Sequence, residues 1–374
     1  MIRSHRIRLN PTPEQAEYFA RAAGTRRFVF NWGLAEWKRQ IEAGGKPSAR
    51  ALKKQFNAIK EEQFPWVYDV TKCVVEGAFM DLAAAFKNFF DGRKARRKVG
   101  FPKFKAKKHS RDGFYLANDK FDMSGHWLKV PKLGLVNMAE TLRFQGKVMA
   151  AHITRTADWW FVSISVEIPD PAQAQNDGQI GIDLGINRLV TLSDGSVLEN
   201  QKPLRSLLRK VKRLSRALSR RQKGGKNREK ARRKLARLHY RIACIRDDLL
   251  HKATTALAEQ YGFIGVESLN VKGMMRNHAL AQALGDAAFG QFATFLSNKV
   301  AVRGGQVQEI GRFYPSSKTC SCCGLVKQDL SLSDRTFVCP ACGFTLDRDW
   351  NAAINILNEA LRLSTSSLGD QCLA

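Results

Sequence analysis

The chain has 374 residues, and its 44% hydrophobic content against 26% charged residues is enough for packed cores, which excludes wholesale disorder. Its length predicts two or three domains. Lys and Arg number 62 against 34 Asp and Glu, a net charge of +28 that predicts a polyanionic partner, nucleic acid first. The longest run without a charged residue, 287–298, is far shorter than the roughly 20 apolar residues of a spanning helix, so we expect no membrane association.

The N-terminal residues MIRSHRIRLN lack the apolar core of a signal peptide, so we expect a cytoplasmic, nucleoid-associated protein in a reducing compartment. Eight cysteines would suit a disulfide framework in a secreted protein. Five of them fall between Cys320 and Cys342, which favours metal binding instead.

The first part of the chain is predicted to be a strand followed by helices. HRIRLN alternates as a strand, and Thr12, Pro13 and Gln15 supply an N-cap, a first-turn proline and a capping-box partner, so a helix should begin at Pro13. Apolar residues continue at helical spacing as far as Phe90, interrupted near Gly44 and at Pro65. We interpret residues 12–92 as a helical insertion.

Residues 93–111 contain ten basic residues and no acid, with Phe101 and Phe104 between the lysines. This composition suits a phosphate backbone, with Lys103 and Lys105 as candidate contacts, although a solvated linker is the alternative. Short alternating runs then predict antiparallel strands between residues 113 and 168, which with the first strand suggest a small barrel. These runs are FYLAND, HWLKVP, LRFQG, VMAAHITRT and WWFVSISVEI.

Residues 169–178, PDPAQAQNDG, read as a domain boundary, and the segment QIGIDLGINRLVTLSDGSVLEN after them predicts a hairpin sheet. The stretch from Lys202 to Arg241 has eighteen Lys and Arg against one acid, Glu229. Leucines at helical spacing give two amphipathic helices hinged at Gly224 and Gly225, whose basic faces we expect to line a nucleic-acid channel rather than to be merely solvated. The candidate contacts are Arg205, Arg209, Arg213, Arg216, Arg220, Arg233 and Arg237.

Cys320 and Cys323, followed after fifteen residues by Cys339 and Cys342, have the spacing of a four-thiolate zinc site, and a glycine follows each pair. The site should be structural, because four protein ligands leave no open position for a catalytic water. Cys322 is an extra thiol between Cys320 and Cys323. We leave it out of the site, because a residue directly beside Cys323 is poorly placed to bind the same metal.

Three acidic residues form a second candidate site. Asp183 lies in the apolar strand GIDLGI, and Glu267 ends another such strand in FIGVESLNV. Asp349 lies in LDRDWNAAINIL, in or just before the first turn of an apolar helix. Carboxylates of this kind can hold two Mg²⁺ ions about 4 Å apart for phosphodiester hydrolysis. The alternative for Asp347 and Asp349 is a helix cap. These patterns predict a basic nucleic-acid-binding protein with a structural zinc, and leave a metal-dependent nuclease open.

The segments GIDLGINRLVTLSDG, RDDLLHKATTALAEQYGFIGVESLNVKGM, YPSSKTCSCCG and CPACGFTLDRDWNAAINIL, in this order, resemble the motifs of the TnpB family of transposon-encoded proteins, relatives of type V CRISPR effectors. The resemblance covers residues 1 to about 360 and is most specific in the second half. Departures are Cys322 and a short tail from about Ser364 that has little helical pattern and that we expect to be flexible.

The resemblance implies a multidomain α+β fold. Residues 1–11 and 93–172 would form a split wedge barrel resembling an oligonucleotide-binding fold, and residues 12–92 a helical recognition domain. Residues 177–374 would form a RuvC-like domain of the RNase H fold, with a basic helical pair at 202–260 and a zinc module at 316–346 inserted in it.

The resemblance also implies RNA-guided cleavage of double-stranded DNA next to a short recognition motif, with Asp183, Glu267 and Asp349 as the first, second and third catalytic acids holding two Mg²⁺ ions. Guide RNA and target DNA would be the partners, and one Zn²⁺ would be structural. Two alternatives remain open: an RNA-guided DNA-binding regulator that no longer cuts, and a DNA transposase.

Overall fold

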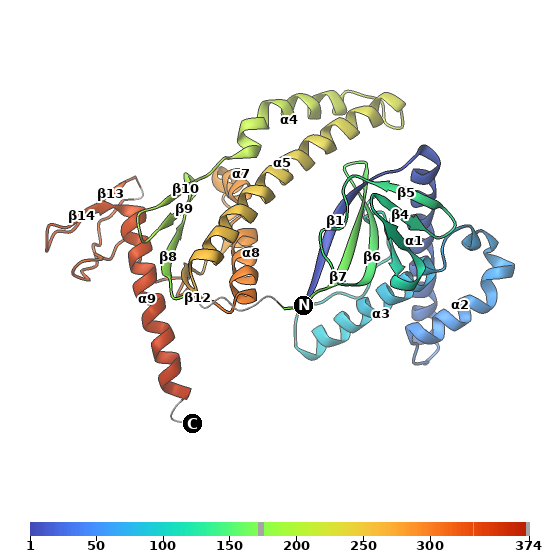
Figure 1. Cartoon of the computed structure of the whole chain (residues 1–374), viewed down its shortest axis with the longest axis horizontal. Coiled ribbons are helices and arrows are strands. Elements are labelled where there is room, and N and C mark those ends of the chain that lie inside the picture. The colour runs from blue at the N-terminus through green and yellow to red at the C-terminus, as the bar shows by residue number, and fades with distance from the viewer. Residues whose placement is uncertain (171–175, 332, 372–374) are drawn as a thin grey trace. The chain divides into compact units, whose positions relative to one another are not determined.

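The computed structural model describes residues 1–170, 176–331 and 333–371, with side chains described as far as Thr365. Contacts divide the chain into two compact units, Met1–Asp170 and Pro171–Ala374, which are described separately below (Figure 1). The predicted boundary at 169–178 includes residues 171–175, which lie outside the described residues. Both units combine helices with sheets, so the fold is mixed α+β. Within the described ranges, no helix is both long and apolar enough to cross a membrane.

The first unit is built on a seven-stranded sheet in the order β2-β6-β7-β1-β5-β4-β3. Its strands are β1 (Ile2–Asn10), β2 (Gly113–Ala117), β3 (Asp122–Ser124), β4 (Trp127–Val130), β5 (Gly134–Met138), β6 (Lys147–Thr156) and β7 (Trp159–Glu167). Phe114 near one edge and Leu128 near the other belong to one buried core, to which Phe19 and Val74 from the helices also belong. Strand pairing among the described residues leaves β2 and β3 as edges, so hydrogen bonds do not close the sheet into a barrel.

One predicted strand is wrong, and two strands, β3 and β5, were not predicted. The run LRFQG is not a strand, and the sheet instead uses β5, just before it. Leu142 and Phe144 of this run pack against the core from a loop, so their alternation reflects anchoring to the core rather than strand pairing.

The helices of the first unit follow β1 and pack on the sheet and on one another. They are α1 (Pro13–Glu42), α2 (Ala49–Gln63), the short 3₁₀ helix η1 (Pro65–Asp69) and α3 (Cys73–Lys94), with a second 3₁₀ turn, η2 (Asn118–Lys120), in the sheet region. The predicted capping box of α1 is present, since the Thr12 side chain accepts from the Gln15 N–H and the Gln15 side chain accepts from the Thr12 N–H. Trp37 is buried and stacks on Phe86, with 3.7 Å between ring centroids.

The second unit is built on a five-stranded sheet in the order β10-β9-β8-β11-β12, in which β8, β11 and β12 run parallel. Its strands are β8 (Gln179–Leu184), β9 (Arg188–Leu192), β10 (Val197–Glu199), β11 (Phe263–Glu267) and β12 (Gln306–Ile310), and a small hairpin is formed by β13 (Thr336–Val338) and β14 (Thr345–Asp347). Its helices are α4 (Pro203–Ser219), α5 (Lys226–Gln260), α6 (Val271–Met274), α7 (His278–Ala287), α8 (Phe289–Val302) and α9 (Arg348–Gln371).

Helices cover both faces of this sheet. Residues of α5 and α8, such as Leu250 and Phe292, share a core with Ile182 and Val266 on one face. Helix α9, drawn in red in Figure 1, contacts β8, β11 and β12 on the other face, where Ile356 packs against Ile310.

Helix α9 is longer than the sequence pattern suggested. Although the sequence from about Ser364 has little helical pattern, the helical backbone continues to Gln371. The Ser364 and Thr365 hydroxyls donate to the Leu361 carbonyl one turn earlier, which lets these polar residues stay in helical conformation.

Candidate active site and cysteine cluster

Two acidic residues lie side by side at the carboxyl ends of β8 and β11. The strands are parallel, with Gly181 opposite Gly265 and Ile182 opposite Val266. Because side chains alternate between the faces of a sheet, Asp183 and Glu267 lie on the same face as these two glycines. This is the face that α9 covers, as the contacts of the glycines show.

The two glycines allow α9 to lie directly on the strands. A Cβ atom at Gly181 would lie 2.1 Å from the Ala353 carbonyl oxygen, and one at Gly265 would lie 2.8 Å from the Ala360 Cβ. Asp349 is one helical turn before Ala353, a rise of about 6 Å, which matches the roughly 6.7 Å between Gly181 and Asp183 along the strand. The helix therefore brings Asp349 to the level of the strand-end acids.

The pKa of Asp183 responds to both of the other predicted acids. Burial, followed by repulsion from Glu267 and Asp349, raises the pKa of Asp183 to about 8, and only Arg348 opposes this rise among the main contributors. None of the described residues is recorded as a hydrogen-bond donor to the Asp183 carboxylate. The three carboxylates are half-buried, and only Arg348 offsets their mutual repulsion at Asp183. Such a group fits a site for divalent cations, because a cation would remove the repulsion.

Asp347 and Asp349 have different roles at the start of α9. Asp347 Oδ1 accepts from the N–H groups of Asp349 and Trp350 at 3.0 and 3.2 Å, and its Oδ2 accepts from Arg188 Nη1 at 2.9 Å. Both oxygens of Asp347 are thus used in capping α9 and joining it to β9. Asp349 accepts a hydrogen bond from the neighbouring Arg348 guanidinium at 3.1 Å. Its charge raises the pKa of Asp183 more than the charge of Asp347 does.

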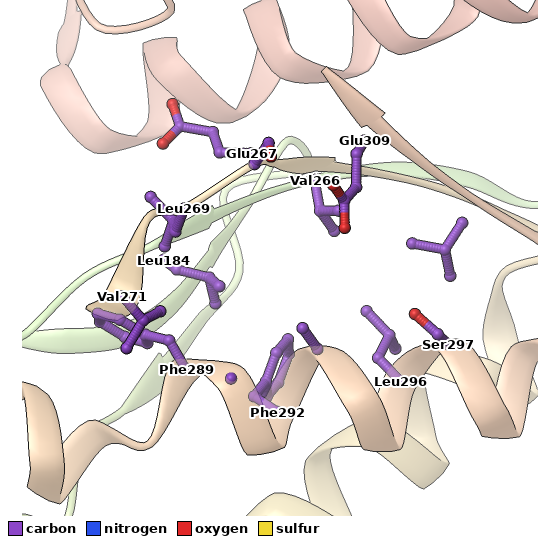
Figure 2. A pocket seen from close by; sticks show the side chains of 14 residues that line it. Leu184, Val266, Glu267, Leu269, Val271, Phe289, Phe292, Leu296, Ser297 and Glu309 are labelled. Atoms are coloured by element: carbon purple, nitrogen blue, oxygen red, sulfur yellow. The ribbon is translucent and has the colours of Figure 1, made fainter. Parts of the chain in front are cut away.

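Glu267 is held by a neighbour that the sequence did not single out. The Ser316 hydroxyl donates to Glu267 Oε1 at 2.5 Å. Figure 2 shows Glu267 turned away from a cavity of about 150 Å³ on the α8 side of the sheet, whereas Glu309 of β12 points into that cavity. Glu309 stands opposite Val266 in the parallel register and so belongs to the opposite face from Glu267.

The four predicted zinc ligands form one cluster. The sulfur atoms of Cys320, Cys323, Cys339 and Cys342 all lie within 4.8 Å of one another. The backbone N–H groups of Cys342 and Ala341 lower the pKa of Cys339 to about 6, which favours the thiolate that a metal requires.

The glycine after each cysteine pair closes a tight turn. Gly324 and Gly343 have φ values of +79° and +71°, and their N–H groups donate to the carbonyls of Cys320 and Cys339. Cys322 is exposed and outside the cluster. Within the described ranges, no other set of His, Cys, Asp and Glu side chains is comparably compact, and this includes Asp183, Glu267 and Asp349.

The basic helical pair, α4 and α5, presents its arginines to solvent. All seven arginines predicted as nucleic-acid contacts are exposed, while Leu238 and Ile242 on α5 are buried. Glu229, the single acid of residues 202–241, pairs with Arg232 at 2.6 Å and with Arg233 at 3.5 Å. An intramolecular ion pair thus already involves Arg233, whereas α4 itself contains no acidic residue to offset its arginines.

Lys103 and Lys105 differ in the structure. Lys103 is exposed. The Lys105 ammonium instead pairs with Asp81 at 2.9 Å and lies over the Phe30 ring, and Asn31 bonds both backbone groups of Lys105. Lys105 therefore anchors its loop to α1 and α3, a role that the charge pattern alone could not distinguish from phosphate contact.

Three family models match the chain. A model described as a probable transposase (OrfB_IS605) matches residues 163–278, the TNB domain of Cas12f1-like proteins matches residues 289–356, and a helix-turn-helix domain of the first family matches residues 1–46. In this structure residues 1–46 contain the strand β1 and the single helix α1.

Relatives align along almost the whole chain. A Streptomyces pristinaespiralis protein named "Putative RNA-guided DNA endonuclease" is 34% identical, covering 98% of this chain and 91% of its own. The Escherichia coli K12 protein named "Putative RNA-guided DNA endonuclease InsQ" is 32% identical, covering 95% of this chain and 92% of its own. This chain belongs to the same family, TnpB, so the resemblance found in its motifs is confirmed.

A solved structure shares the fold. The mini-RNA-guided endonuclease CRISPR-Cas_phi3 aligns with a TM-score of 0.51 at 11% identity, covering 96% of this chain and 92% of that chain. The likeness concerns the fold, because so low an identity says nothing of individual residues.

Proposed function

We propose that this protein is an RNA-guided DNA endonuclease that cleaves double-stranded DNA complementary to a bound guide RNA. The observation that carries the proposal is the convergence of Asp183, Glu267 and Asp349 from β8, β11 and α9 onto one end of one sheet face. The near full-length relationship to proteins named as RNA-guided DNA endonucleases supports it.

We assign the three acids as ligands of two Mg²⁺ ions. Bound there, the ions would stabilise negative charge at phosphorus and on the attacking and leaving oxygens of a hydrolytic displacement. The protein's own part is to fix the carboxylates: Asp183 by its strand, Glu267 by its strand and Ser316, and Asp349 by the first turn of α9. Rigid elements hold such a site more accurately than loops do.

We assign one structural Zn²⁺ to the four cysteines of the module at residues 316–346. The four sulfurs form a closed set from two glycine turns, so a metal there has its coordination filled by protein.

We assign the nucleic-acid partners by charge and exposure. The exposed arginines of α4 and α5, together with Lys103, would contact phosphates of the guide RNA or the target DNA, while guide pairing would read the target sequence. The first unit would carry the wedge (1–11 and 93–172) and recognition (12–92) functions, including contact with a short motif beside the target. Residues 177–374 would be the RuvC-like nuclease.

The test is expression together with the native flanking locus, sequencing of the co-purified RNA, and cleavage of matching DNA in Mg²⁺. We expect one RNA species with a constant scaffold and a variable end that specifies the cut DNA. Asp183→Ala should abolish cutting and retain target binding. Binding without cutting by the unmodified protein would identify a regulator, whereas joined DNA products formed after RNase treatment would identify a transposase.

A further inference from the structure

Two buried asparagines on α9 hold the loop that leads into the cysteine cluster. Asn351 and Asn355 are 0% and 3% exposed and lie four residues apart, on the same face of the helix. Asn351 Nδ2 donates to the Thr319 carbonyl at 2.7 Å and its Oδ1 accepts from the Ser321 N–H at 3.0 Å. Asn355 Nδ2 donates to the carbonyls of Ser316 and Thr319 at 2.8 and 2.6 Å.

Buried amides are stable only when they are hydrogen-bonded, so these contacts fix the loop relative to the helix. The loop contains Ser316 at one end and Cys320 at the other. Ser316 is buried, and among the described residues its hydroxyl is the only recorded hydrogen-bond donor to the Glu267 carboxylate. The helix that carries Asp349 therefore also sets, through the loop, the position of Glu267.

We propose that Ser316 is a positioning residue for Glu267, held in place by Asn355 and Asn351, so that the loop links the cysteine module to the catalytic acids. This inference rests on the proposed nuclease function. By donating to Oε1, the hydroxyl fixes the rotamer of Glu267 and leaves its other oxygen for a cation. Without the hydroxyl, the carboxylate rotates freely and spends less time in the position needed for metal binding.

The experiment compares Ser316→Ala, Ser316→Thr and the adjacent control Ser317→Ala as full-length complexes with guide RNA. We expect Ser316→Ala to raise the Mg²⁺ concentration for half-maximal cutting by about 10- to 100-fold, the usual effect of losing a group that orients a metal ligand. Target binding, zinc content and thermal midpoint should stay close to those of the unmodified protein. Ser316→Thr, which keeps the hydroxyl, should restore most of the Mg²⁺ response, and Ser317→Ala should behave as the unmodified protein.

Asn355→Ala provides a second route to the same contact. It should raise the Mg²⁺ requirement, and the double variant with Ser316→Ala should be no worse than the more affected single variant, because both act through one hydrogen bond. Additive effects would overturn the proposed link. So would a normal Mg²⁺ response in Ser316→Ala, or an equal defect in Ser317→Ala.

Failure of the nuclease assignment is separable from failure of this inference. If the unmodified complex does not cut, the proposed function fails. Mn²⁺ binding measured by electron paramagnetic resonance then tests the positioning role directly. Weaker Mn²⁺ binding in Ser316→Ala than in Ser317→Ala supports the role, and equal binding in the two variants overturns it.

Discussion

Gly181 of β8 lies directly under the Ala353 carbonyl of α9, so closely that a Cβ atom on Gly181 would stand 2.1 Å from that oxygen. This contact sets how near the helix approaches the sheet. Since Asp349 is one turn before Ala353 and Asp183 is two residues after Gly181, the same contact sets the separation of two of the proposed catalytic acids.

Gly181→Ala should therefore destabilise the second unit and reduce DNA cutting. Backbone atoms must move to admit the methyl group, and overpacking of this kind costs about 1–3 kcal/mol of unfolding free energy. Chemical denaturation and cleavage assays on the same preparation would measure both effects. Gly290→Ala on α8 is the matched control, because a Cβ there meets nothing within 4 Å, and it should be neutral or slightly stabilising. Equal unfolding free energies for the two variants would contradict the close approach of α9 to Gly181.

Asp183 should make the Mg²⁺-free protein more stable in mild acid. Its folded pKa of about 8 exceeds the ordinary value of 3.8, so between these pH values the folded state holds a proton that the unfolded state has lost. This contribution to stability is complete below about pH 4 and is lost as the pH rises through about 8.

Asp183→Asn removes that dependence while keeping the side-chain shape. We expect its thermal midpoint at pH 8 without Mg²⁺ to exceed that of the unmodified protein, and its DNA cutting to be absent. Thermal scans from pH 5 to pH 9, with zinc retained, would check the prediction. Parallel curves for both proteins would show that Asp183 is ionised throughout.

Cys339→Ser should lose zinc and unfold the cysteine module. Metal binding supplies much of the folding free energy of such small modules, and backbone N–H groups hold the pKa of Cys339 below its ordinary value, which favours the thiolate. Metal analysis and hydrogen exchange across residues 316–346 would measure the loss. Cys322→Ser is the control, since Cys322 lies outside the cluster, and it should keep one zinc per chain. A zinc-free unmodified protein would overturn the assignment.

Reversing charge on α4 should weaken nucleic-acid binding and flatten its salt dependence. Arg209, Arg213 and Arg220 are exposed and lie near one face of the helix. Each lost phosphate contact should lower the slope of log K against log salt by about 0.7 to 0.9. Binding titrations of the triple Glu variant would measure this slope. The triple Lys variant keeps the charge and should keep the slope, whereas an unchanged slope in the Glu variant would indicate arginines that are only solvated.

The sequence by itself predicted the features whose signal is local. The capping box of α1 depends on Thr12 and Gln15, three residues apart, and the cysteine cluster depends on two short pairs with glycines. The spacing of residues within one helical turn, or within one Cys-x-x-Cys-Gly turn, largely determines where their side chains lie. The family assignment also followed from local motifs and their order along the chain.

Tertiary structure decided what depends on residues far apart in the chain. The sequence did not show which of Asp347 and Asp349 caps the helix, or that Lys105 is held in an ion pair. It also did not show that LRFQG is a loop packed on the core rather than a strand. The capping bonds of Asp347 are local, but Arg188, which binds its other oxygen, is distant in the chain. Lys105 and LRFQG likewise depend on partners brought close by folding, which are Asp81 and the core of the first sheet. Ser316 was missed for the same reason, although two asparagines four apart in the apolar helix WNAAINIL were a visible signal of a buried polar contact. Side-chain type sets what a residue can bond to, but only the folded chain supplies the partner.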